Sequence, residues 1–296
     1  MHGLGNDFVM LDLVTNEAHL TPERILELGH RHFGIGFDQV LVVQPPSAPD
    51  VDFDYRIFNV DGEEVEHCGN GARCFANFVF EQGLTAKNPI RVKTINRILT
   101  LHRNANGEVS VDMGRPEFDP ALIPFKTETQ APVYTRSVEI DGETLELTFS
   151  ALSMGNPHAV LSVEDLDNSA VTKIGSALCG HPDFPAGVNV GFMQILSPSE
   201  IKLRVFERGA GETLACGTGA CAAVVSGCLR GVLSDTVKVN LTGGQLQISW
   251  PQESASVTMT GPTATVFEGT IELRVMRHQQ QSRSIVMSHP SCQLIR

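Results

Sequence analysis

Two cysteines, Cys68 and Cys216, occupy the same short motif in the two halves of the chain. Each one opens the pattern C-G-x-G-A, and a run of small or apolar residues that predicts a helix follows. A cysteine at a helix N-terminus lies near unpaired N–H groups and the positive end of the helix dipole, and both favour the thiolate. The same N–H groups can bind a carboxylate or phosphate, and the paired glycines let a ligand approach the backbone. Each motif therefore predicts a thiol beside an anion site.

The sequence around these motifs is repeated as well. Residues 56–72 and 204–220, at an offset of 148, are identical at seven of 17 positions. Upstream, Gly5-Asn6 matches Gly155-Asn156 at an offset of 150. Two matches in the same order indicate a duplicated half rather than a solenoid, whose period would be about 20–50 residues. We therefore expect two similar lobes that face each other across a cleft, with a thiol on each side of one bound molecule.

Two acid/base groups on opposite sides of one carbon suit the inversion of a stereocentre, since one removes a proton and the other returns one. A lone cysteine at the start of a small-residue helix is more often a packing residue, but packing alone does not require the same motif twice. The other cysteines lack this repeated context and are interpreted as structural: Cys74, Cys179, Cys221, Cys228 and Cys292. Zinc-ligand spacing, G-x-G-x-x-G, a Walker loop and G-x-S-x-G are absent from the sequence, and no lysine stands in a recognisable pyridoxal setting.

Composition excludes several other classes. The chain has 296 residues, 42% of them hydrophobic, and a formal net charge of -12. Disorder is excluded by the apolar content, and general nucleic-acid binding by the acidic balance. No apolar run approaches the ~18 residues of a membrane span, and the start shows no signal peptide. An odd cysteine count does not fit a secreted disulfide scaffold and favours a cytoplasmic, thiol-keeping protein. The length predicts two domains, at roughly 100–200 residues per domain.

The periodicity predicts short strands that alternate with a few helices. Thr21-Pro22 reads as an N-cap and first helical position, and Asp141-Gly142 as a hairpin turn. The proline-spaced stretch 115–132 is the expected linker. Further helices are expected at 171–180 and after each C-G-x-G-A. Strands are expected at 8–13, 39–43, 53–58, 90–94, 98–102, 108–113, 188–196, 201–206, 237–241, 244–250, 256–260, 263–267 and 270–273.

At its motifs the chain resembles the diaminopimelate epimerases. The matching stretches run from residue 2 to about residue 273: HGLGNDF (2–8), GIGFDQ (34–39), RIFNVDG (56–62), CGNGARC (68–74), MGNPH (154–158), NVGFMQ (189–194), IKLRVFERGAGET (201–213) and ACGTGACAA (215–223). The resemblance implies an α/β (α+β) fold of two pseudo-symmetric lobes, each a β-structure wrapped around a central helix, with the active site in the cleft between them. The implied lobes are 1–115, completed by 264–273, and 116–263, and 274–296 is expected to be a disordered tail.

The resemblance also implies an activity. Such enzymes interconvert LL- and meso-2,6-diaminopimelate, for lysine and peptidoglycan synthesis, without pyridoxal phosphate, metal or other cofactor, and as homodimers. By motif position Cys68 and Cys216 are the two bases. Gly69 and Asn70 in one lobe, and Gly217 and Thr218 in the other, hold the reacting carboxylate. The remaining substrate-binding positions are Asn6, Gln39, Asn59, Asn156, Asn189, Glu207 and Arg208. His158 is a candidate to support the thiol chemistry, with a structural histidine as the alternative.

The family usually has a few strand residues before HGLGND, so we expect a short first strand here. Three other functions stay open at this point. A related racemase would act on proline or 4-hydroxyproline. A dithiol redox protein would cycle the two cysteines through a disulfide. A non-catalytic binding protein would hold diaminopimelate without exchanging its α-proton.

Overall fold

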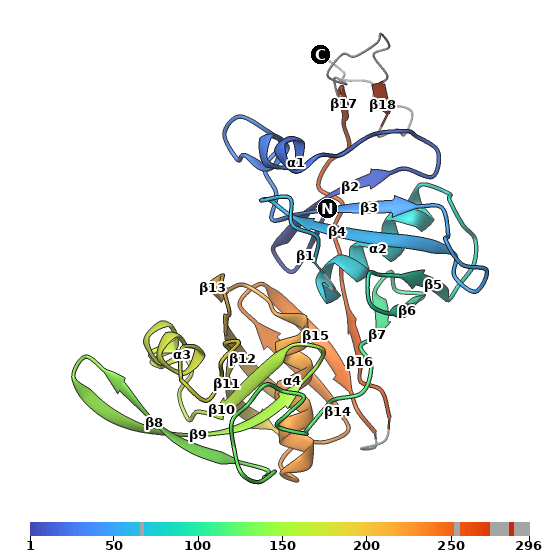
Figure 1. Ribbon diagram of the computed structural model, residues 1–296. Coiled ribbons are helices and arrows are strands. Elements are labelled where there is room, and N and C mark those ends of the chain that lie inside the picture. The colour runs from blue at the N-terminus through green and yellow to red at the C-terminus, as the bar shows by residue number, and fades with distance from the viewer. Residues whose placement is uncertain (66–67, 252–254, 273–283, 287–296) are drawn as a thin grey trace, which may run out of the picture. The chain divides into compact units, whose positions relative to one another are not determined.

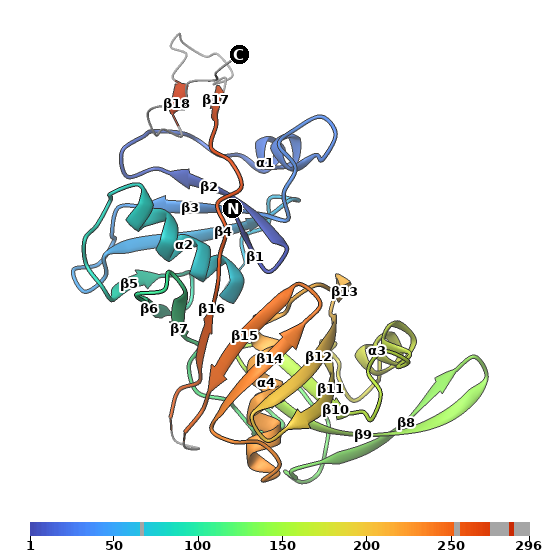
Figure 2. The same cartoon turned by 180° about the vertical axis from the view of Figure 1, so that it is seen from behind.

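The computed structural model describes residues 1–65, 68–251, 255–272 and 284–286. The chain forms two compact units, and each is described by itself. Unit 1 comprises residues 1–109 and the segment from Thr263 onwards, and unit 2 comprises residues 110–262. The first unit thus ends at Val109, earlier than the expected position 115. Figure 1 shows the elements of both units, and Figure 2 shows the same chain from behind.

Unit 1 is built on a mixed sheet with strand order β1-β2-β3-β4-β5-β6. Its strands are β1 (His2–Gly3), β2 (Asn6–Asp12), β3 (Gln39–Gln44), β4 (Phe53–Asn59), β5 (Ile90–Lys93) and β6 (Ile98–Arg103). Its helices are α1 (Pro22–Gly29) and α2 (Gly69–Glu81). A separate two-stranded sheet pairs β17 (Thr270–Glu272) with β18 (Ser284–Val286).

Unit 2 has strand order β7-β16-β15-β14-β12-β11-β10-β9-β8, with β13 paired to β12. Its strands are β7 (Val109–Asp112, of which Val109 still belongs to unit 1), β8 (Tyr134–Ile140), β9 (Glu143–Ser153), β10 (Pro157–Ser162), β11 (Asn189–Ser197), β12 (Glu200–Glu207), β13 (Gly211–Thr213), β14 (Thr236–Leu241), β15 (Gly244–Ser249) and β16 (Thr258–Gly261). Its helices are α3 (Val171–Cys179) and α4 (Gly217–Leu229).

The two units repeat one connectivity. In unit 1, β2 pairs with β3 in parallel across the α1 crossover, β3 pairs with β4 antiparallel, and α2 follows. In unit 2, β10 pairs with β11 in parallel across the α3 crossover, β11 pairs with β12 antiparallel, and α4 follows. After each cysteine helix the next strand pairs in parallel with the antiparallel partner just described: β5 pairs with β4, and β14 pairs with β12. The fold class predicted from the sequence, two similar α/β lobes, is confirmed.

Strand alternation in unit 1 divides its apolar side chains between two helices. Val9 and Val40 belong to the cluster that contains Ile25 of α1. On the opposite face, the ring of Tyr55 lies 4.6 Å from that of Phe75 in α2. Successive residues of a strand point to opposite faces, so the sheet lies between α1 and α2. Figure 2 shows α2 lying across these strands.

Unit 2 follows the same rule. Ala159 and Val190 belong to the cluster that contains Val171 and Leu178 of α3. A Cβ on Gly219 of α4 would lie 3.1 Å from Val205 Cγ2 on β12. Both cysteine helices are buried almost all round over their first three turns. A helix that is buried on all sides carries apolar residues around its whole circumference. The small and apolar residues of α4 agree with this.

Several local predictions are confirmed. Thr21 Oγ1 accepts from Arg24 N at the start of α1, and Pro22 occupies the first helical position. Asp141 and Gly142 both have positive φ, 54° and 85°, as a type I′ turn between β8 and β9 requires. The first strand is short, as expected, because β1 ends at Gly3.

Two expectations need correction. The stretch 115–132 is not a free linker, because Ile123 and Phe125 are buried in the core of unit 2. The expected strand at 263–267 is reduced to a single bridge between His2 and Ala264. Of the expected disordered tail, 274–296, the structure describes only β18, and the rest lies outside the described residues.

Candidate active site

Cys68 is the N-cap of α2, as its motif predicts. Its backbone is extended, with φ -137° and ψ 109°, and its Sγ accepts from Gly71 N at 3.3 Å. The thiol also lies 3.6 Å from Oδ1 of Asn6, which stands at the start of β2. Asn70, in the first turn of α2, places its Nδ2 3.5 Å from the same oxygen. Unit 1 thus brings together three of the predicted side chains at one helix N-terminus.

Cys216 is the N-cap of α4 and repeats this geometry. Its φ and ψ are -120° and 111°, and its Sγ accepts from Gly219 N at 3.4 Å. Thr218 Oγ1 lies 3.6 Å from the sulfur. Two copies of the motif therefore produce the same helix-capping thiol, each with one N–H of its own helix directed at the sulfur.

The expectation that both helix ends favour the thiolate is not met at Cys216. Burial raises the pKa of its thiol well above the usual value, and the nearby Glu207 carboxylate raises the pKa further. The Thr218 hydroxyl and the Gly219 N–H act in the opposite direction and are outweighed. Cys216 is therefore a thiol at neutral pH in the ligand-free protein.

The other predicted residues lie at the strand ends beside these two helices. Gln39 and Asn59 face each other on β3 and β4, and Gln39 Nε2 donates to Asn59 Oδ1 at 2.9 Å. In unit 2, Asn189 Oδ1 accepts from Arg208 N at 2.8 Å. Thr213 Oγ1 donates to Glu207 Oε1 at 2.5 Å.

Arg208 is exposed, and its guanidinium donates to Ala186 O at 2.6 Å. Asn156 precedes β10, and its Oδ1 lies 3.1 Å from His158 Nε2. Unit 1 therefore gathers Asn6, Gln39, Asn59, Cys68, Gly69 and Asn70, and unit 2 gathers Asn156, His158, Asn189, Glu207, Arg208, Cys216, Gly217 and Thr218.

An ion pair recurs at the same place in both units. Arg56 donates to Glu64 at 2.8 and 2.7 Å, and Arg204 donates to Glu212 at 2.6 and 3.0 Å. Each pair ties a strand to the segment between that strand and the cysteine. Bidentate arginine–carboxylate pairs fix geometry as well as contribute energy, so these two of the seven identical positions serve to position the segment. An arginine and a glutamate at the same spacing in both copies were the sequence signal that could have revealed these ion pairs.

The family model for diaminopimelate epimerase matches residues 1–118 and 150–266. The chain belongs to the diaminopimelate epimerase family. Among its relatives are the diaminopimelate epimerases of Thioalkalivibrio sulfidiphilus and Nitrosomonas europaea, 55% and 56% identical over 275 and 273 residues. In both alignments 92% of this chain and 98% of the relative are covered. The protein is accordingly an isomerase of the racemase/epimerase class.

Solved structures of more distant proteins share the fold. A hydroxyproline epimerase from Agrobacterium vitis has a TM-score of 0.61 at 15% identity and covers 88% of this chain and 87% of its own. A phenazine biosynthesis protein of the PhzF family from Bacillus anthracis has a TM-score of 0.60 at 17% identity, with coverage of 88% and 92%. At these identities the likeness concerns the fold alone.

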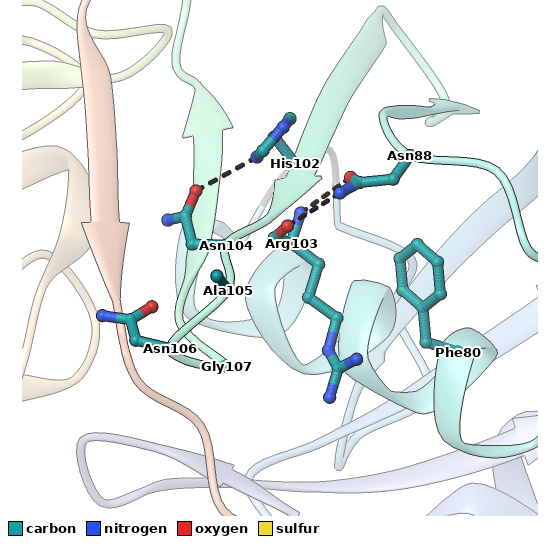
Figure 3. Close-up of a pocket in the computed structure, with 8 residues that line it drawn as sticks. All are labelled: Phe80, Asn88, His102, Arg103, Asn104, Ala105, Asn106 and Gly107. Carbon is teal, nitrogen blue, oxygen red and sulfur yellow. Dashed lines mark hydrogen bonds between the residues drawn. The ribbon is translucent and has the colours of Figure 1, made fainter.

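A hollow in unit 1 lies away from the cysteine motif. It is lined by the end of α2, by Asn88 before β5, and by the end of β6 with the turn that follows it. Figure 3 shows the lining residues: Phe80, Asn88, His102, Arg103, Asn104, Ala105, Asn106 and Gly107. None of the predicted site residues lines it. Within the described residues, no group of three or more His, Cys, Asp and Glu side chains is placed to hold a metal ion. No helix in the same part of the chain is long and apolar enough to cross a membrane.

His158 gives this family member a pH-dependent stability that can be measured. Burial lowers its pKa to about 3, below the ordinary 6.5. Between these two pKa values the unfolded chain binds a proton at this histidine and the folded chain does not. The contribution of His158 to the free energy of unfolding is therefore fully present above pH 6.5 and is lost as the pH falls towards 3. At pH 5 we expect wild type to have lost about 2 kcal/mol more than His158→Gln, relative to pH 7.5. Urea unfolding of both proteins at the two pH values measures this; equal losses would contradict it.

Proposed function

We propose that the protein interconverts LL- and meso-2,6-diaminopimelate by proton transfer at the α-carbon, with Cys68 and Cys216 as the two bases and no cofactor. The observation that carries the proposal is the repeated cysteine N-cap: two thiols in the same geometry at the starts of corresponding helices. The relatives named diaminopimelate epimerase, which align over nearly the whole chain, support the substrate.

In the proposed reaction the Cys68 thiolate takes the α-proton, so that the Cα–H bond breaks and an S–H bond forms. The Cys216 thiol gives its proton to the opposite face of the same carbon. The raised pKa of Cys216 supports its start as the acid in this direction. After one turnover the two sulfurs have exchanged protonation states, and the reverse reaction uses the opposite roles.

The α-proton of an amino acid is far less acidic than a thiol, so the developing carbanion needs stabilisation. Backbone N–H groups in the first turns of α2 and α4 are the proposed donors to the reacting carboxylate, beside Gly69, Asn70, Gly217 and Thr218. Preorganised donors act most strongly where water is excluded. The burial of both helix starts supports this assignment, because only Cys68 and Thr218 among these positions are partly exposed.

Side-chain types at the strand ends fit a substrate with two carboxylates and two ammonium groups. Arg208 can donate to a carboxylate, and Glu207 can accept from an ammonium. Gln39 Oε1 is buried and has no hydrogen-bond partner among the described residues. A buried acceptor of this kind costs free energy until it is paired, which supports its proposed place beside the substrate. Asn6, Asn59, Asn156 and Asn189 offer both donors and acceptors.

The product would serve lysine and peptidoglycan synthesis, and the reaction needs two reduced thiols, which a cytoplasmic location provides. A homodimer is the proposed assembly.

Solvent exchange tests the proposal directly. The full-length protein is incubated with LL-diaminopimelate in heavy water under reducing conditions, and NMR follows α-deuteration and formation of the meso isomer. We expect both, with no added metal or pyridoxal phosphate. Binding without exchange would indicate a binding protein. Activity on proline or 4-hydroxyproline instead would indicate a related racemase, and a disulfide formed during normal turnover would indicate a redox protein.

A further inference from the structure

Four side chains of unit 1 form a hydrogen-bonded chain that passes beside Cys68. Arg73 NH2 donates to Asn70 Oδ1 at 3.0 Å. Asn70 Nδ2 lies 3.5 Å from Asn6 Oδ1, and Asn6 Nδ2 donates to Asp38 Oδ2 at 2.9 Å. Donors and acceptors alternate along this chain, so every link runs in the same direction, from Arg73 to Asp38.

The two ends of the chain fix its direction. A guanidinium can only donate and a carboxylate can only accept. Rotating the Asn6 amide by half a turn would place its oxygen against Asp38 and its NH2 against the NH2 of Asn70. Both new contacts would be repulsive, so the charged ends allow only one orientation of the two amides between them.

Both ends are held in place by other contacts. Arg73 is fully buried in α2. Asp38 accepts from Arg31 NH2 at 2.6 Å, and its carboxylate also accepts from Asp7 N at 3.1 Å. Arg31 forks onto Asp7 at 2.8 and 3.0 Å. Although partial burial raises the pKa of Asp7, the hydrogen bond from Arg31 leaves it below the usual value.

The orientation of Asn6 matters because its Oδ1 is the atom next to the Cys68 thiol, at 3.6 Å. A carbonyl oxygen accepts from an S–H but repels a thiolate. The hydrogen-bonded chain of side chains therefore favours the protonated form of Cys68. The helix N-terminus acts in the opposite direction, because it favours the thiolate. Asn6 rotated the other way would present its NH2 and favour the thiolate.

Two other ionisable groups among the described residues interact electrostatically with Cys68, namely Tyr55 and Cys74. Burial raises the pKa of Tyr55 well above its usual value and that of Cys74 to about 12, so both are uncharged at neutral pH. Arg73 is the cation that faces Cys74. Asp38 is the anionic end of the hydrogen-bonded chain, and Asn6 lies between its carboxylate and the Cys68 thiol.

Unit 2 has neither end of this chain. At the offset of 150 the counterpart of Asp38 is Val188, and at the offset of 148 the counterpart of Arg73 is Cys221. The counterpart of Asn6, Asn156, instead directs its Oδ1 at His158 Nε2. The chain is thus a property of the Cys68 half alone, and the repeat does not require it.

We propose that Asp38 and Arg73 are positioning residues that orient Asn70 and Asn6 so that the Asn6 oxygen holds Cys68 as the thiol in the ligand-free protein. A substrate group that donates to Asn6 Oδ1 then removes this acceptor from the sulfur, which couples ionisation of Cys68 to binding. The second step rests on the proposed function. The first does not, and it is tested without substrate.

The test measures the ionisation of Cys68 in the full chain by the pH dependence of alkylation with iodoacetamide, read on the Cys68 peptide by mass spectrometry. Asp38→Ala removes the acceptor and frees the Asn6 amide. One hydrogen bond corresponds to a fall of about 0.4–1 unit in the pKa of Cys68, or about a 3–10-fold faster alkylation below that pKa. Asp38→Val, which installs the residue of the other half, is expected to give the same shift.

Matched variants separate orientation from charge. Asp38→Asn removes the negative charge but keeps a carbonyl acceptor for Asn6, so the pKa of Cys68 is expected to stay near that of wild type. Asp50→Ala, which removes an exposed carboxylate that pairs with Arg91, is expected to leave it unchanged. An unchanged pKa in both Asp38→Ala and Asp38→Val would overturn the proposal. An equal shift in Asp38→Asn would also overturn it, because charge alone would then explain the effect.

Discussion

Cys68→Ala and Cys216→Ala are each expected to lower kcat/KM for epimerisation of LL-diaminopimelate by about 10²–10⁴-fold or more. A positioned acid or base contributes about this factor, and an inversion that needs a group on each face loses its route when either one is missing. The two single variants should therefore be comparably impaired, in both directions of the reaction. Initial rates of LL-to-meso and meso-to-LL conversion measure the effect.

A cysteine outside the repeated motif provides the control for these variants. Cys228 lies near the end of α4 and donates to Ser234 O at 3.3 Å. Cys228→Ser keeps a donor at that place and is expected to retain nearly full activity. If either Cys68→Ala or Cys216→Ala epimerised the substrate at nearly the wild-type rate, the two-base mechanism would be wrong, whatever the family membership.

The duplication could be predicted because two short stretches of the sequence show it directly. The identical residues at 56–72 and 204–220 lie on a strand, a turn and a helix start, and the structure gives both copies the same ladder of strands. Turn chemistry was equally local, as at Asp141-Gly142. Predictions from such segments need no knowledge of distant contacts.

Other features depend on contacts between distant residues and could not be predicted. Ile123 and Phe125 stand among prolines that suggest a linker, yet tertiary packing against β8 and β9 buries them. Asp38 has its partners at Arg31, Asp7 and Asn6, up to 32 residues away. Asn6, Asp7 and Asp38 lie in motifs of the sequence, but no motif or periodicity shows that their side chains meet. The members of the cluster come from three separate segments that the pairing of β2 with β3 brings together.

The second glycine of each C-G-x-G-A motif has a reason that the sequence did not suggest. A Cβ added to Gly71 would lie 2.5 Å from the Tyr55 hydroxyl and 2.9 Å from Leu41 Cδ2. These atoms belong to strands β3 and β4, so the glycine lets the helix pack closely on the sheet. The close approach expected for a ligand is here an approach of the helix to its own sheet.

Gly71→Ala is accordingly expected to destabilise unit 1 and to impair catalysis. The overlap costs about 1–3 kcal/mol, and the better helix propensity of alanine returns at most about 1 kcal/mol. Because Gly71 N donates to the Cys68 sulfur, a shifted helix start also moves the thiol. Misplacement of a reacting group by about 1 Å can cost about 10²-fold, so we expect kcat to fall by about 10–10²-fold.

Gly219→Ala is the matched variant in the other half. Its added Cβ would meet Val205 Cγ2 at 3.1 Å and Cys216 Sγ at 3.2 Å, which small movements can relieve. Stability should therefore change little, although the contact with sulfur can still lower kcat. Amide hydrogen exchange of the α2 and α4 peptides follows each unit separately. Loss of protection in α2 for Gly71→Ala, with α4 preserved in Gly219→Ala, is the expected pair of results. Equal protection in both variants would mean that the Tyr55 hydroxyl and Leu41 yield without cost, and that strand packing does not require the glycine.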